Sequence, residues 1–252
     1  MLVDTHCHLN YPPLLEKADE IVARAQAAGV GRMICVGTDL RTSRQAISLA
    51  EKFTAVYAAV GIHPHDVGKT TTDSLDDLEK LLDHPKVVAV GEIGLDFYRN
   101  YSPHDVQKEY FRKQIAIARR HLLPFIVHNR QAYDAVLEIL NTENYWQGVM
   151  HCFSENAEAI RHLTAMGLHI SFTGNATYGN EKTERSVAAV PIDRLMIETD
   201  APFILPKGAS GRNNEPAFLP VIAERIAMIR KTTPNVIAES TTRNALNFFR
   251  LN

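Results

Sequence analysis

Histidines and carboxylates recur in this sequence at the ends of short apolar runs. His6 and His8 stand two positions apart, directly behind the apolar start of the chain. Residues at this spacing on a strand point to the same side, so we expect the two imidazoles to converge on one point. Imidazole is the commonest metal ligand among side chains. The spacing therefore predicts a metal site rather than two separately packed histidines.

Glu92 follows one of the most apolar stretches of the chain, residues 87–91. A carboxylate in such a place is costly unless it is paired or binds a metal. Its two oxygens can bridge two cations, which lie about 3.5–4 Å apart in two-metal sites. The alternative is a buried salt bridge to a lysine or an arginine.

Other ionisable side chains follow later apolar runs. His128 and His151 come after the fifth and sixth runs, where they could hold a second ion. Asp200 comes after the eighth run. In a closed barrel the eighth strand neighbours the first, so Asp200 would lie next to His6 and His8. Glu198, two residues earlier, shares its orientation and either binds an ion itself or supports a ligand. Asp96 is assigned the same supporting role.

The elements that must position these side chains alternate regularly. Eight short and nearly all-apolar runs predict parallel strands buried on both faces, at residues 1–3, 33–36, 55–60, 87–90, 124–127, 148–150, 168–172 and 195–197. Amphipathic patterns predict helices at residues 14–28, 42–52, 74–82, 103–122, 132–140, 156–165, 181–189 and 217–230, and after residue 234. Asp73 and Ser154 are predicted as N-caps, and Gly29 and Gly167 as helix ends.

Eight strand–helix alternations in 252 residues predict an α/β fold of the (β/α)8 TIM-barrel class, with residues 1–252 forming one domain. A doubly wound open sheet is the alternative, because it produces the same alternation. In such barrels the functional face is formed by the carboxyl ends of the strands. The histidines and carboxylates follow the strands, as a site on that face requires.

Composition narrows the function classes. The formal net charge is -2, so no field of the whole protein attracts nucleic acid, and an acidic substrate would need a local site. The three cysteines form no CxxC pair, which fits a reducing compartment. No basic leader and no long apolar segment are present, so we expect a cytoplasmic protein without a membrane span. A phosphate-binding GxxxxGK[ST] loop is also absent.

Six motifs together resemble the TatD family of metal-dependent nucleases, a branch of the amidohydrolase-like barrels. They are DTHCHL, GIHPH, GEIGLDFY, IVHNR, HCFS and IETDAPF, in family order and over essentially the whole chain. The family's metal ligands correspond to His6, His8, Glu92, His128, His151 and Asp200. The resemblance implies hydrolysis of phosphodiester bonds in DNA, often as a 3′-to-5′ exonuclease on single strands, with RNA as a further possible substrate.

The resemblance also implies two divalent cations, with Mg²⁺ supporting activity and Zn²⁺ often present. Four imidazoles favour Zn²⁺, Mn²⁺ or Ni²⁺ over Mg²⁺, so metal identity stays open among Zn, Mg and Mn. Our hypothesis is that Glu92 bridges the ions, which lower the pKa of a water molecule. Asp200 binds one ion and accepts the proton of that water. We expect a monomer that needs no protein partner.

Four residues are predicted to contact the substrate: His63, Arg130, Lys207 and Arg212. The loop that carries the last two departs from the family, whose contiguous RGK run is spread apart here. Hydrolysis of an amide, a lactone or a phosphotriester is the alternative activity. Related barrels for that chemistry often bridge their metals with a modified lysine at the position of Glu92. A metal-dependent scaffold without turnover is a further alternative.

Overall fold

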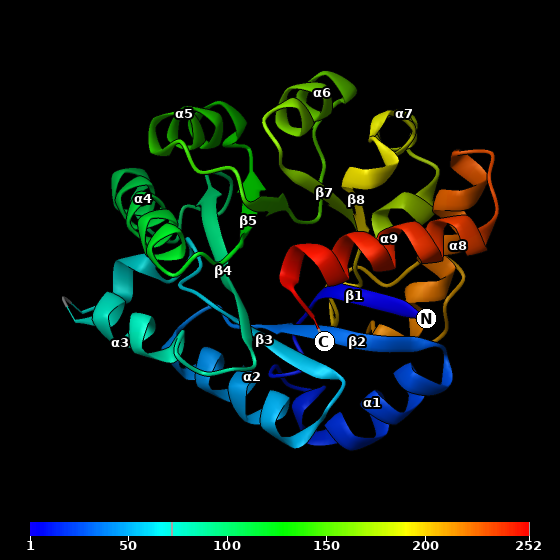
Figure 1. Cartoon of the computed structure of the whole chain (residues 1–252), viewed down its shortest axis with the longest axis horizontal. Helices are drawn as coiled ribbons and strands as arrows, with labels where there is room; N and C mark the ends of the chain where they lie inside the picture. The colour runs from blue at the N-terminus through cyan, green and yellow to red at the C-terminus, as the bar shows by residue number, and fades with distance from the viewer. Residues whose placement is uncertain (72, 252) are drawn as a thin grey trace.

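The alternating apolar runs form eight parallel strands of one sheet, arranged in sequence order from β1 to β8 (Figure 1). The structure is a computed structural model that describes residues 1–71 and 73–251. The strands are β1 (Leu2–Cys7), β2 (Val30–Val36), β3 (Val56–Val60), β4 (Val87–Asp96), β5 (Phe125–Arg130), β6 (Gly148–Met150), β7 (His169–Phe172) and β8 (Leu195–Ile197). A doubly wound sheet would reverse its strand order, so the predicted TIM barrel is confirmed and the open-sheet alternative is wrong.

Helices alternate with the strands and surround the sheet (Figure 1). They are α1 (Ala18–Ala27), α2 (Leu40–Lys52), α3 (Ser74–Leu81), α4 (His104–Arg120), α5 (Tyr133–Glu143), α6 (Ala157–Ala165), α7 (Glu181–Ala189), α8 (Leu219–Ile229) and α9 (Pro234–Phe249). Two predicted helices begin as short 3-10 turns, Leu15–Lys17 before α1 and Pro216–Phe218 before α8. The side chain of Asn156 caps α6 by accepting from the amides of Glu158 and Ala159, so the prediction of Ser154 as the cap was wrong.

The barrel closes between its last and first strands, just beyond the end of β8. The amide of Asp200 donates to the carbonyl of His6 at 2.9 Å, and the amide of His8 donates to the carbonyl of Ala201 at 2.7 Å. The hydroxyl of Thr5 adds a bond to the carbonyl of Ile197 at 3.1 Å. These bonds place Asp200, which lies just beyond β8, beside His6 and His8.

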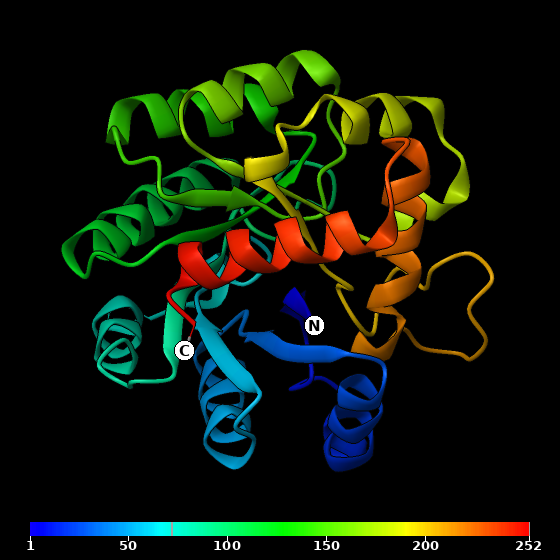
Figure 2. The same cartoon turned by 45° about the vertical axis from the view of Figure 1, so that its right-hand side comes forward.

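One end of the barrel is filled with apolar side chains and covered by α9 (Figure 2). Ala245 and Phe249 of α9 pack against the strand residues Val3, Ile34, Tyr57, Val88, Ile126 and Met196, among others. The side chain of Asn244 donates to the carbonyl of Leu195 at 2.9 Å, at the start of β8. Helix α9 therefore covers the amino ends of the strands and leaves the carboxyl ends for polar side chains.

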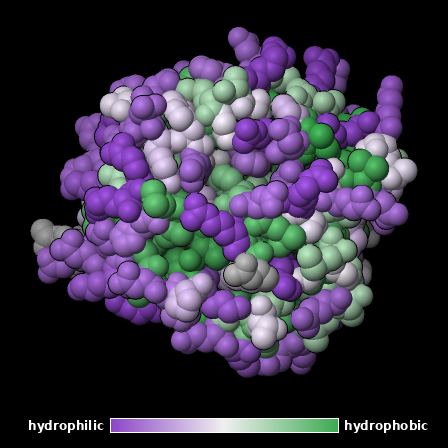
Figure 3. Space-filling model, viewed as in Figure 1, coloured by the Kyte–Doolittle hydropathy of each residue, from purple (hydrophilic) through white to green (hydrophobic). Residues whose placement is uncertain are grey.

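Figure 3 shows the face that carries α9. Hydrophilic residues spread over it, with smaller apolar areas between them. Within the described ranges, no helix combines the length and the apolar character that crossing a bilayer requires.

Several strands continue beyond the apolar runs that predicted them. Strand β4 reaches Asp96 and β5 reaches Arg130, whereas the apolar patterns ended at residues 90 and 127. Strand β1 likewise extends to Cys7. The polar continuations place His6, Glu92, Asp96 and His128 on strand backbone, whereas His8, His151 and Asp200 lie just beyond the ends of β1, β6 and β8.

Candidate metal centre

The histidine pair and the carboxylate of Asp200 converge at the seam of the barrel. His6 Nε2 lies 3.1 Å from His8 Nε2. Asp200 Oδ1 lies 3.7 Å from the first of these nitrogens and 3.5 Å from the second. The ladder between β1 and β2 shifts register between Asp4 and Cys7, and such a bulge redirects side chains. The predicted convergence of the two imidazoles is therefore present.

Glu92 lies between two groups of histidines, and each of its oxygens faces one group. Oε2 is 3.5 Å from His6 Nε2 and 3.7 Å from His8 Nε2. Oε1 is 2.8 Å from His128 Nδ1, 2.9 Å from His151 Nε2 and 3.4 Å from His63 Nε2. The ion pairs of Glu92 with described residues all involve histidines, so the alternative of a lysine or arginine partner is not observed.

The backbone around Glu92 brings neighbouring strands unusually close. The β4–β5 ladder shifts register between Val90 and Ile93. A Cβ at Gly61 of the preceding loop would lie 2.6 Å from the carbonyl carbon of Gly91, closer than real Cβ atoms approach. Only a glycine at position 61 lets the chain after β3 pass this close to Glu92. The same segment places His63, two residues later, beside Glu92.

The spacing of the donor atoms fits a divalent cation. With metal–ligand distances of about 2.0–2.2 Å, tetrahedral donors lie roughly 3.3–3.6 Å apart. The Nε2 atoms of His6 and His8 lie 3.1 Å apart, and each of them lies 3.5 to 3.7 Å from Glu92 Oε2 and from Asp200 Oδ1. A second set of donors, from His63, Glu92 and His128, also lies within 4.8 Å of one another. The two sets share Glu92.

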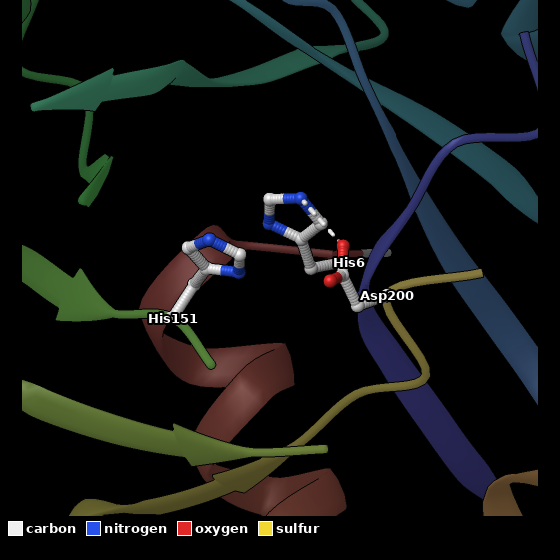
Figure 4. A group of neighbouring side chains, drawn as sticks. All are labelled: His6, His151 and Asp200. Atoms are coloured by element: carbon white, nitrogen blue, oxygen red, sulfur yellow. Dashed lines mark ion pairs between the residues drawn. The ribbon is translucent and has the colours of Figure 1, made fainter. Parts of the chain in front are cut away.

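Figure 4 shows a third set of donors, from His6, His151 and Asp200, which come from β1, the end of β6 and the segment after β8. The two imidazole rings are stacked, with centroids 4.1 Å apart and planes inclined by 13°. The set overlaps the His6–His8 group. The six predicted metal ligands therefore lie in one continuous cluster.

Asp4 supports the donor cluster through hydrogen bonds to the backbone of His6 and to Thr199. Its carboxylate accepts from the hydroxyl of Thr199 at 2.5 Å, from the amide of Thr199 at 2.9 Å and from the amide of His6 at 3.3 Å. Burial raises the pKa of Asp4 to about 7, although these hydrogen bonds oppose the increase. A single buried carboxyl group thus joins the strand of the histidine pair to the segment of Asp200.

Glu198 orients one of the candidate ligands. Its Oε1 accepts from the amide of Cys152 at 2.6 Å and lies 3.2 Å from His151 Nδ1. The opposite nitrogen of His151 faces Glu92. This is the contact expected of a residue that supports a metal-binding histidine.

Asp96 makes the corresponding contact on the other side of the cluster. Its Oδ2 lies 3.2 Å from His128 Nε2 and 2.7 Å from His65 Nε2. Its Oδ1 accepts from the amides of Tyr98 and Arg99. The sequence analysis missed His65, because a histidine after a proline in a loop carries no sign that its side chain reaches a strand carboxylate.

The pKa values of the cluster follow from burial and from mutual attraction. Burial would raise the pKa of Glu92, but His151, His63 and His128 hold that pKa well below its usual range. Burial would also raise the pKa of Asp200, but the contact with His8 outweighs it and lowers the pKa. Burial lowers the pKa of His63 to about 4. Ionised carboxylates and a neutral imidazole are the forms that bind cations.

Other histidines of the cluster hold protons more tightly. Burial lowers the pKa of His151, but the negative charges of Glu92 and Glu198 outweigh it and raise the pKa well above its usual value. The pKa of His8 is also raised, because Asp200 outweighs the effect of burial. A cation must displace these protons, so its affinity should fall as the pH falls.

The cluster forms the floor of a cleft of about 670 Å³. His63 lines the cleft close to Glu92, and Arg130 lines it at the rim, with its guanidinium 4.1 Å from the centre of the Tyr98 ring. Lys207 and Arg212 are exposed on the loop after β8 and do not line the cleft. The structure thus brings two of the four predicted substrate contacts to the cleft.

The cleft also contains residues that the sequence analysis did not assign to the site. Tyr11, Arg99, Cys152 and Phe203 line it. Phe97, in contrast, stacks on His104 with centroids 3.9 Å apart. Aromatic residues in loops give no periodic signal, so only the structure shows which of them face the site.

Known proteins resemble this chain over its full length. The sequence profile described as TatD related DNase matches residues 3–250. A protein of Bacillus subtilis named uncharacterized metal-dependent hydrolase YabD is 42% identical, and the alignment covers 100% of both chains. A protein of Salmonella typhimurium named 3'-5' ssDNA/RNA exonuclease TatD is 35% identical over 99% of both chains.

A solved structure gives the same result. The crystal structure of YjjV, a TatD homologue of Escherichia coli, superimposes with a TM-score of 0.95 at 31% sequence identity and covers 100% of this chain and 98% of its own. Profile, sequence and structure agree over nearly the whole chain. The chain therefore belongs to the TatD-related DNase family of metal-dependent hydrolases.

Proposed function

We propose that this TatD-family hydrolase removes nucleotides from the 3′ ends of single-stranded DNA, with RNA as a second substrate, at a site for two divalent cations. The observation that carries the proposal is the position of Glu92. Its two oxygens face different sets of donors, which is the arrangement of a bridging ligand. The Salmonella relative, named 3'-5' ssDNA/RNA exonuclease TatD, supports the substrate and the polarity.

Two groups of residues would hold the cations. His6, His8 and Asp200 form the first group, and His128 and His151 the second, with Glu92 common to both. When bound, such cations polarise phosphoryl oxygens and lower the pKa of water. The imidazoles favour Zn²⁺ or Mn²⁺, whereas carboxylates also accept Mg²⁺.

Asp200 is the proposed proton acceptor. Its pKa is lowered by the neighbouring histidines, so the carboxylate is ionised near neutral pH. It is only 8% exposed yet lines the cleft, so it can reach a water molecule beside a bound phosphodiester. A buried and ionised carboxylate at the floor of an open cleft suits general-base catalysis.

Arg130 and His63 are the proposed phosphate contacts. The guanidinium of Arg130 lies at the exposed rim and can bind phosphoryl oxygens through two parallel hydrogen bonds. His63 lies on the floor beside Glu92. Together they would orient the scissile phosphate above the donor cluster.

A nuclease assay tests the proposal. End-labelled single strands of DNA and RNA are incubated with the protein and added Mg²⁺, Mn²⁺ or Zn²⁺, beside amide, lactone and phosphotriester substrates. We expect stepwise shortening from the 3′ end that requires a cation and is lost in His6→Ala. Turnover of only the small substrates would contradict the nuclease assignment.

Asp200→Asn tests the proton acceptor in the same assay. The amide cannot accept the proton, so turnover should fall by about 10²–10⁴-fold. Circular dichroism and metal content, measured on the same sample, should show an intact fold that still takes up cations. Near-normal turnover would rule out the assigned role.

The proposal includes a cytoplasmic location and a monomeric state. Cys7, Cys35 and Cys152 are free thiols, which are typical of a reducing compartment. Sedimentation of the active enzyme as a single chain would agree with this part of the proposal.

A further inference from the structure

Exposed aromatic side chains gather on one end of the barrel. Within the described residues these are Tyr98, Tyr101, Tyr178 and Phe203. They lie on the segments after β4, β7 and β8, at the carboxyl ends of the strands. Phe203 also lines the cleft above the donor cluster. A half-exposed aromatic ring beside a hydrolytic site has a face available for a planar ligand.

Phe203 and Tyr11 form a corner beside His8. Their ring centres are 6.2 Å apart and their planes are inclined by 86°. The ring of Tyr11 stacks on His8 at 4.9 Å, and the ring of Phe203 meets the same imidazole edge-on at 5.9 Å. The corner is therefore in direct contact with His8, just after β1, whereas Arg130 ends β5, four strands away in the sheet order.

Hydrogen bonds hold the backbone that carries Phe203 and the ring of Tyr11 in place. The amide of Phe203 donates to the carbonyl of Asp200 at 2.9 Å, and the carbonyl of Phe203 accepts from Asn214 Nδ2 at 2.7 Å. The hydroxyl of Tyr11 shares a hydrogen bond of 2.5 Å with Thr38. The Tyr11 ring, held before binding, loses little entropy when a ligand packs against it.

We propose that Tyr11 and Phe203 form the binding site for one of the two nucleobases that flank the scissile phosphate, with Phe203 as the stacking surface. This inference rests on the proposed nuclease function. A phosphate above the cluster would direct one nucleoside toward this corner and the other toward Arg130. Stacking on an aromatic face tolerates every base, as an exonuclease that removes successive nucleotides requires.

The rival explanation is that Phe203 only shields His8 from water. A shield would affect cleavage of every substrate to the same extent, whether or not the substrate carries a base. A stacking surface acts only when the base is present. The two roles therefore differ in how a missing base changes the rate.

The test compares strands that carry all their bases with strands that are abasic at the terminal or the penultimate position. For wild type, one of these abasic strands should show a kcat/KM that is roughly 5- to 150-fold lower, the range measured for base–aromatic stacking. In Phe203→Ala this ratio should fall toward one, and in Phe203→Tyr, which keeps an aromatic face, it should persist. An unchanged ratio in Phe203→Ala would overturn the inference.

A binding measurement separates the two proposals. In the Asp200→Asn background, a strand carrying 2-aminopurine at the sensitive position should lose fluorescence on binding, and Phe203→Ala should abolish that loss. Equal quenching in both proteins would also overturn the inference. If wild type cleaves none of the strands, the nuclease proposal itself fails, whatever the behaviour of Phe203.

Discussion

At the scale of single residues, Asp4 illustrates how a side chain without a direct role can determine the geometry of the site. It lies two residues before His6 and bonds to the residue before Asp200. It therefore connects candidate ligands that are almost 200 positions apart in the chain. Buried carboxylates of this kind are costly to leave unpaired, so its partners and its position depend on one another.

Replacing Asp4 by Ala should destabilise the fold and loosen the cluster. The amide and hydroxyl of Thr199 would lose their acceptor, and each unsatisfied buried group costs about 1–3 kcal/mol. Urea unfolding should show a loss of that order, and the variant should retain less metal after dialysis. Asp4→Asn, which keeps an acceptor oxygen, is the matched control and should lose less. A loss below 0.5 kcal/mol for Asp4→Ala, the ordinary range for surface changes, would argue against this role.

At the scale of elements, the segment after β8 is organised by one buried amide. Asn214 Nδ2 donates to the carbonyls of Thr199 and Phe203 at 2.7 Å each, and to that of Ile204 at 3.2 Å. This long loop has few regular backbone bonds of its own, so a side chain satisfies its carbonyl groups instead. The same amide thereby fixes the turn that carries Asp200 and Phe203.

Asn214→Ala should disturb the site without touching it directly. Three carbonyls lose a donor, so the free energy of unfolding should fall by about 1–3 kcal/mol. The kcat/KM for oligonucleotides should fall as well, because Asp200 and Phe203 are no longer held. The exposed neighbour Asn213 provides the control. Equal stability and activity of Asn213→Ala and Asn214→Ala would contradict the prediction.

Sequence patterns predicted the order and type of the elements better than their ends. Apolar runs located all eight strands, but they stopped short in β1, β4 and β5. The strands continue there through polar residues whose burial depends on one another, and hydrophobic periodicity cannot detect such residues. For the same reason the six candidate ligands were visible as polar residues at strand ends, whereas Tyr11, His65 and Phe203 were not.

At the scale of the whole molecule, the two ends of the barrel differ in the side chains that they contain. The amino end is closed by α9 and contains apolar side chains, and the carboxyl end carries the donor cluster. His169 lies near the closed end, 7% exposed, with its ring 4.5 Å from that of Phe248 and no hydrogen-bond partner for Nδ1. The protonation of His169 therefore affects the stability of the barrel and is separate from metal binding at the donor cluster.

The lowered pKa of His169 predicts that the free energy of unfolding decreases in weak acid. Burial lowers the pKa of His169 from 6.5 to about 4. Below pH 6.5 the unfolded chain gains a proton that the folded chain does not accept until about pH 4, so the free energy of unfolding falls with pH across that window. The loss attributable to His169 should approach about 3 kcal/mol.

Urea unfolding of wild type and His169→Gln between pH 7 and pH 4 provides the measurement. Both proteins keep the histidines of the cluster, so the difference between the two curves isolates His169. We expect the variant to have the shallower curve. Parallel curves would show that His169 is protonated equally in the folded and unfolded chains.

The closure of the barrel after β8 has a consequence for the synthesis of the protein. His6 and His8 leave the ribosome early, but Asp200 and the amide of Asn214 follow about 200 residues later. A nascent chain that ends before them can form several strands yet lacks the complete donor set. Hydrolytic activity should therefore arise only after the segment that carries Asp200 and Asn214 has been synthesised.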